Sequence, residues 1–216
     1  MSVRQLSRPG ADLLRGLRRP APPRPERCAF CGTGLPAGHR HLADTGERAL
    51  ACACTACALL FQQPGAGGGR YRAVPDRVLT DPVNGLDDAA WAALRIPVTT
   101  AFLLRGADSA RPPVLCYPSP AGATEAELEP AVWRTVFGRS RLAAALEPDV
   151  EALLLRRTRD RIQCLLVPVD LCYELVGRMR LRWQGFDGGA EAHAELDAFF
   201  AALEARARPL PKEAPA

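Results

Sequence analysis

The chain has 216 residues, of which 48% are hydrophobic, and a formal net charge of +4 at pH 7. This length accommodates one sizeable domain and one small module, and no apolar run reaches the roughly 18 residues of a membrane-spanning helix. The N-terminus also lacks the apolar core of a signal peptide. These features argue against a membrane span and predict a soluble, cytoplasmic protein with reduced cysteines.

Residues 1–27 differ from the rest of the chain in charge. They contain seven arginines and two acidic residues, so the remaining chain is nearly neutral. Four prolines between positions 20 and 25 exclude a continuous helix there. We therefore predict a flexible basic arm over 1–27. The near-neutral body argues against a broad nucleic-acid-binding face.

Cysteine and histidine are concentrated between residues 28 and 61, which hold five of the eight cysteines and two of the three histidines. Two C-x2-C pairs occur there, with 22 residues between them. This spacing is typical of four-thiolate metal sites, because a tight turn aims both thiolates of a pair at one point. Gly32 suits the positive-φ position that such a turn requires. We predict a metal module over 28–61 with four ligands: Cys28, Cys31, Cys54 and Cys57.

The residues between the two pairs predict a hairpin, with strands at 39–43 and 47–51 and a turn at 44–46. This hairpin would bring the second pair back to the first. A module of about 35 residues is too small to fold by burial alone, so the metal would supply on the order of 10 kcal/mol of its folding free energy.

Three further residues of the module are candidate ligands: Cys52, His39 and His41. Cys52 could replace Cys54 as a ligand, hydrogen-bond to a ligand sulfur, or join a histidine in a second site. The two histidines are two residues apart on a predicted strand and thus share a face, which suits either a metal site or a solvated edge.

The spacing leaves the ion open, since four thiolates accept zinc or a single iron. The first pair with its glycine, Cys-Ala-Phe-Cys-Gly, also suits a rubredoxin-like iron site. The second pair is followed by Ala58 instead of glycine, and this favours zinc. The module is thus predicted to be zinc-ribbon-like or rubredoxin-like.

The rest of the chain predicts a Gly-rich linker at 62–69, a larger domain at 70–208 and a disordered tail at 209–216. The larger domain lacks the strand–helix alternation of a parallel α/β fold, so we expect an α+β fold of antiparallel hairpins covered by helices. The predicted hairpins pair 98–105 with 113–117 and 150–155 with 162–167.

Helices are predicted for 130–145, after a capping pattern at Thr124, for a segment capped by Asp170, and for 190–208. Three cysteines lie in apolar runs and are expected in the core: Cys116, Cys164 and Cys172. The loop at 183–189 joins Trp183 and Phe186 with glycines and is expected to plug the core or to contact a partner. No nucleophile–histidine grouping is suggested, so we expect no enzyme.

Two stretches of the chain resemble an uncharacterised bacterial family with the same two-part layout. They are CAFCGTGLPAGHRHLADTGERALACACTACALLF and, far downstream, CYELVGRMRLRWQGFDGGAEA. The resemblance extends over nearly all of residues 27–208. Members of that family tend to be encoded beside uptake nickel-iron hydrogenase genes, which implies an accessory role for such a hydrogenase. The family carries no assigned activity, so it gives the matched cysteines and histidines no roles.

We therefore expect a metal-stabilised, non-enzymatic accessory protein whose client is a hydrogenase subunit or maturation factor. A closed four-thiolate site leaves no open coordination position for catalysis. One alternative is a rubredoxin-like one-iron electron-transfer protein. The other is a zinc-ribbon nucleic-acid-binding protein, which the near-neutral body disfavours.

Overall fold

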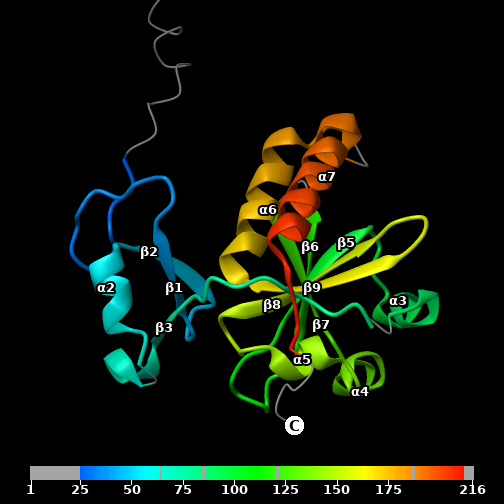
Figure 1. The fold of residues 1–216 in the computed structure, drawn as a ribbon, viewed down its shortest axis with the longest axis horizontal. Helices are drawn as coiled ribbons and strands as arrows, with labels where there is room; N and C mark the ends of the chain where they lie inside the picture. The colour runs from blue at the N-terminus through cyan, green and yellow to red at the C-terminus, as the bar shows by residue number, and fades with distance from the viewer. Residues whose placement is uncertain (1–24, 64, 84–85, 120–121, 186–187, 212–216) are drawn as a thin grey trace, which may run out of the picture.

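The computed structural model describes residues 25–63, 65–83, 86–119, 122–185 and 188–211. These residues form one three-stranded sheet and one seven-stranded sheet with helices (Figure 1), so the predicted α+β class is confirmed. Most of the predicted arm and the last residues of the predicted tail lie outside the described residues. No helix in the described ranges is both long and apolar enough to cross a membrane.

The three-stranded sheet has the order β2-β1-β3, with both pairings antiparallel. Its strands are β1 (Arg40–Asp44), β2 (Ala49–Ala53) and β3 (Tyr71–Ala73). The predicted hairpin is confirmed, although each strand begins one or two residues later than expected. The later start of β2 has a local cause, because the Asp44 carboxylate accepts hydrogen bonds from the backbone N–H groups of Gly46 and Glu47 and widens the turn.

A short helix, α2 (Thr55–Leu60), and a 3-10 helix, η1 (Ala66–Gly69), connect β2 to β3. Part of the predicted linker thus has regular structure. Strand β3, which the sequence assigned to the larger domain, pairs with β1 of the cysteine module. Arg70, just before β3, explains this pairing, because its guanidinium donates to Asp44 Oδ2 through both Nε and Nη2, at 2.9 and 2.8 Å.

The seven-stranded sheet has the order β10-β4-β9-β8-β5-β6-β7. All its pairings are antiparallel except that of β10 with β4. Its strands are β4 (Leu79–Thr80), β5 (Thr100–Leu104), β6 (Val114–Ser119), β7 (Gly122–Glu127), β8 (Glu151–Arg157), β9 (Ile162–Pro168) and β10 (Arg208–Pro209). Both predicted hairpins are present, as β5–β6 and β8–β9.

Helices cover both faces of this sheet (Figure 1). One face packs against α6 (Val169–Arg182) and α7 (Gly189–Arg206). The other packs against α3 (Asp88–Leu94), α4 (Pro130–Phe137) and α5 (Arg141–Ala145). The central strands are therefore buried on both sides. In β8, for example, Leu154 faces α6 and α7 while its neighbour Leu153 faces the opposite layer.

The predicted capping role of Thr124 is wrong, because Thr124 and Glu127 lie in β7, an edge strand paired with β6, whereas α4 begins at Pro130 as predicted. Six consecutive backbone pairings with β6 outweigh the local capping pattern. The helix predicted over 130–145 is divided into α4 and α5, and Ser140 caps α5 by accepting a hydrogen bond from Ala143 N–H. Asp170 lies in the first turn of α6, whose N-cap is Pro168.

The cysteine module packs against the larger domain through apolar side chains and polar contacts, among them hydrogen bonds to backbone carbonyls. Ala43 of β1 and Val74 lie in one buried cluster with Val150 and Val169. The Arg72 guanidinium donates to the Pro148 carbonyl oxygen at 2.5 Å. From the other side, the Tyr173 hydroxyl of α6 donates to the carbonyl oxygen of Arg48 in the β1–β2 turn at 3.5 Å.

Candidate metal centre

The first cysteine pair lies on a tight turn at the start of the described chain. Residues Arg27 and Gly34 form an antiparallel bridge at the base of this turn. Within it, Cys28 N–H donates to Thr33 O at 2.8 Å, and Gly32 N–H donates to Cys28 O at 2.9 Å. Gly32 adopts φ +74°, the left-handed conformation that the sequence predicted for it. The turn thereby directs both sulfurs to one side.

The second pair lies where β2 passes into α2. Cys54 is the N-cap of α2, and its sulfur accepts a hydrogen bond from Cys57 N–H at 3.4 Å. Backbone N–H groups in the first turn of a helix lack partners within the helix and stabilise negative charge at the N-cap. This position therefore suits a thiolate.

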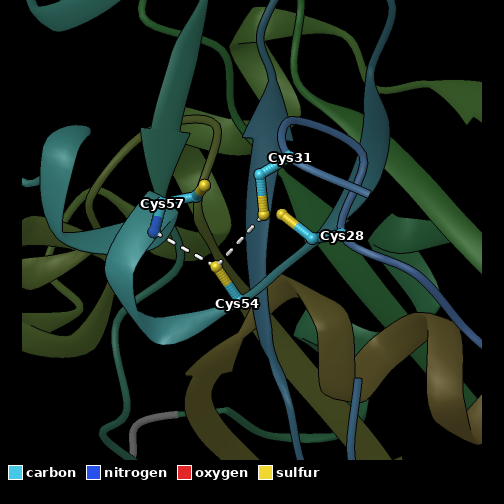
Figure 2. A group of neighbouring side chains, drawn as sticks. All are labelled: Cys28, Cys31, Cys54 and Cys57. Atoms are coloured by element: carbon cyan, nitrogen blue, oxygen red, sulfur yellow. Dashed lines mark hydrogen bonds between the residues drawn. The ribbon is translucent and has the colours of Figure 1, made fainter. Parts of the chain in front are cut away.

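The four sulfurs converge from the two turns (Figure 2). They all lie within 4.8 Å of one another, and the Cys31 and Cys54 sulfurs are 3.8 Å apart. A tetrahedral ion with metal–sulfur bonds of about 2.3 Å places its ligand sulfurs about 3.8 Å apart. The chain thus brings together the four predicted ligands at a spacing that can bind a metal ion. The geometry suits zinc and iron alike.

The cysteines of this cluster differ in acidity. Burial alone would raise the pKa of Cys28, but backbone hydrogen bonds from Cys54, Cys31 and Phe30 lower it to about 6. Hydrogen bonding to Cys54 and burial raise the pKa of Cys57 to about 12. Four neighbouring sulfurs cannot all ionise without a counter-charge, because each thiolate repels the next. A bound divalent cation would supply that charge.

Three aromatic rings pack beside the sulfur cluster. Phe30, Phe61 and Tyr71 contact one another with centroid separations of 5.1 to 5.7 Å. They belong to the small core of the module, in which Leu42 and Ala53 are fully buried. This core is small, which agrees with a module that needs a metal ion for stability.

Cys52 does not join the four-sulfur cluster. Its sulfur and one ring nitrogen each of His39 and His41 form a second group, within 4.8 Å of one another. Register explains the grouping, since Cys52 lies directly opposite His41 across the β1–β2 ladder. The imidazole rings of His39 and His41 are 4.7 Å apart, as their predicted common face requires.

A model of a family of unknown function, DUF5947, matches residues 27–207. The chain belongs to this family. No curated protein and no solved structure matched the chain. Membership in DUF5947 therefore assigns no activity to either group of ligand residues.

The other cysteines and the third histidine of this DUF5947 member lie outside these two groups. Cys116, Cys164 and Cys172 are buried in the core of the larger domain, as predicted. Burial raises the pKa of Cys116 and of Cys164 to about 12, so both thiols are protonated and unreactive. His193 is exposed on α7 and contacts the Gly189 carbonyl oxygen. In the loop before α7, Trp183 is partly buried against the core, and Phe186 lies outside the described residues.

Sequence reasoning missed the partner of His41. Asp170 Oδ2 lies 2.9 Å from His41 Nδ1, although 129 residues separate them in the chain. Asp170 was noticed only as a candidate helix cap. No local pattern links a helix-start aspartate to a strand histidine, so only the packing of the module against α6 reveals this contact.

Proposed function

We propose that this protein is a non-enzymatic adaptor whose cysteine module is folded by one zinc ion, and that its client is a subunit or maturation factor of an uptake nickel-iron hydrogenase. The observation that carries the proposal is the convergence of four cysteine sulfurs at tetrahedral spacing. Four protein thiolates complete the coordination of zinc, so the ion has a structural role.

The surface next to the metal centre supports a protein client. Leu59 and Leu60 follow the second cysteine pair on α2 and are 54% and 71% exposed. Two adjacent exposed leucines on one short helix can form an apolar contact site for another protein. Because α2 begins at the ligand Cys54, the metal ion would hold both leucines in place. The family resemblance supplies the hydrogenase as the class of client.

Co-purification tests the client. We expect the tagged full-length chain, expressed in its native host under hydrogenase-inducing conditions, to retain a hydrogenase subunit or maturation factor. A Leu59→Ser/Leu60→Ser variant should lose this partner. Leu181→Ser, which changes a leucine on α6 that is 86% exposed, should keep it. Absence of any hydrogenase protein in the wild-type preparation would overturn the proposal of a hydrogenase client.

A second candidate is a one-iron electron-transfer protein. It is favoured by the exposure of Cys31, which would place one edge of the metal site at the surface, where electron transfer to a partner is fastest. The metal identity separates the two functions. Zinc and a colourless protein support the adaptor, whereas iron with visible thiolate-to-iron absorption supports electron transfer.

A further inference from the structure

The second group of the module, formed by His39, His41 and Cys52, has the donor types of a metal site. One ring nitrogen from each histidine and the Cys52 sulfur lie within 4.8 Å of one another. Ligand atoms around zinc are about 3.3 to 3.8 Å apart, given bonds of about 2.0 to 2.3 Å. Binding one ion would therefore require the three atoms to approach one another by at most about 1.5 Å.

Hydrogen bonds set the tautomer of both histidines. His39 Nδ1 is 3.0 Å from the Pro36 carbonyl oxygen, and His41 Nδ1 is 2.9 Å from Asp170 Oδ2. A carbonyl or carboxylate oxygen accepts and does not donate, so each Nδ1 carries the proton. In this tautomer Nε2 is the ring nitrogen that carries the lone pair. This is the arrangement in which metal-binding histidines are held, with the second nitrogen donating to an oxygen.

The environment of His39 supplies a separate observation. Its side chain is 6% exposed, and its Nε2 atom is buried without a hydrogen-bond partner among the described residues. An unsatisfied buried polar atom costs about 1 to 3 kcal/mol. One ring nitrogen of His39 lies within 4.8 Å of a ring nitrogen of His41 and of the Cys52 sulfur. A metal ion between these three residues would satisfy the Nε2 lone pair.

From this geometry we propose that His39, His41 and Cys52 bind a second transition-metal ion, distinct from the ion of the four-cysteine cluster. A thiolate with two imidazoles suits zinc or a similar first-row divalent ion. Three protein ligands leave one position of a tetrahedron for a ligand from outside the cluster. Asp170 acts as a positioning residue, because it orients the His41 ring from α6 of the larger domain.

This site does not depend on the proposed adaptor function. Its ligands and those of the four-cysteine cluster are different residues of the same module. A substitution at the second site therefore removes no ligand of the four-cysteine cluster, and a metal count then reports the loss of the second ion alone. The two proposals can thus fail separately.

Metal counting by native mass spectrometry, after reconstitution of the full-length chain with Zn²⁺ and removal of excess ion, tests the site. We expect Cys52→Ala and His39→Ala each to hold one zinc ion fewer per chain than wild type. His193→Ala, which removes the exposed histidine of α7, should hold the wild-type number. An unchanged count in Cys52→Ala and His39→Ala would overturn the second site.

Two further measurements distinguish metal binding from a packing role. With Co²⁺ as the probe, the difference spectrum between wild type and Cys52→Ala should show a thiolate-to-cobalt band, and its absence would overturn Cys52 as a ligand. Asp170→Asn should weaken the second ion by about 10- to 100-fold. Asp160→Asn, an exposed change in the β8–β9 turn, should not alter the affinity. Equal affinity in both variants would overturn the positioning role of Asp170.

Discussion

The two sheets of this protein are stabilised in different ways. The seven-stranded sheet lies between two helical layers, and each of its faces buries a large apolar cluster. The three-stranded sheet has a small core with only four buried members among the described residues, one of them the candidate ligand Cys28. Burial can stabilise the first, whereas we propose that the second depends on a metal ion that links its cysteines. Changes that remove the metal site should therefore leave the seven-stranded sheet folded, and changes in its apolar core should leave the three-stranded sheet folded.

Loss of the four-cysteine site should have the largest effect. Cys54→Ser, or zinc removal by a chelator, should unfold β1, β2, α2 and β3, because metal binding supplies on the order of 10 kcal/mol. Hydrogen exchange should show fast exchange in the module and continued protection of β8 and β9. As the reciprocal control, Cys172→Ala should destabilise the larger domain without loss of zinc. Slow hydrogen exchange in the module after complete metal removal would contradict the proposal that the module depends on a metal ion.

The next largest effect should come from the ion pair of the buried Glu151 in the larger domain. Glu151 is fully buried, and its carboxylate accepts two hydrogen bonds from Arg77, at 2.6 and 2.8 Å. Glu151→Ala removes the main carboxylate partner of Arg77, which keeps its contacts to Glu147 and the Ala145 carbonyl oxygen, and should cost about 3 kcal/mol of unfolding free energy. Urea denaturation measures this cost.

The control for this pair is an exposed one. Glu174 pairs with Arg178 on the surface of α6, so Glu174→Ala should cost less than about 1 kcal/mol. Zinc content should stay at the wild-type value in both variants. Equal costs for Glu151→Ala and Glu174→Ala would show that burial does not determine the strength of the Arg77 pair.

Two glycines of η1 give a smaller, matched test inside the module. Both have positive φ, so alanine at either should cost about 1 to 2 kcal/mol. A Cβ at Gly67 would also lie 2.6 Å from Phe61 Cε1, whereas a Cβ at Gly68 meets nothing within 4 Å. Gly67→Ala should therefore cost about 1 to 3 kcal/mol more than Gly68→Ala. Thermal unfolding of the module checks this difference, and equal costs would mean that Phe61 moves freely.

The smallest effect concerns the turn that joins β1 and β2. Hydrogen bonds from Arg70 lower the pKa of Asp44 below its usual value. A carboxylate with a depressed folded-state pKa stabilises the fold above its unfolded pKa of about 3.9 and loses this contribution as the pH falls through the folded value. The difference in free energy of unfolding between wild type and Asp44→Asn should thus be largest at neutral pH and decrease in acid. Urea titrations followed by NMR of module amides measure this difference. A difference that does not change with pH would contradict the stabilising role of the Asp44 carboxylate.

Regular local patterns in the sequence predicted most of the larger domain. Strands β5, β6, β8 and β9 stand out because apolar runs are bounded by polar turns, and the predicted pairings are correct. Strand β7 was missed because its residues at 122–127 are polar and exposed, as an edge strand allows. The division between α4 and α5 was missed because one apolar pattern continues across both helices.

For the candidate site, the sequence by itself determined the four-cysteine cluster, since C-x2-C spacing fixes how two sulfurs lie on one turn. It also determined that His39 and His41 share a face. Only the tertiary structure decided the place of Cys52, which depends on the register of β1 and β2. Only the tertiary structure brought Asp170 to His41, because α6 reaches the module by packing over a sequence distance that no local pattern spans.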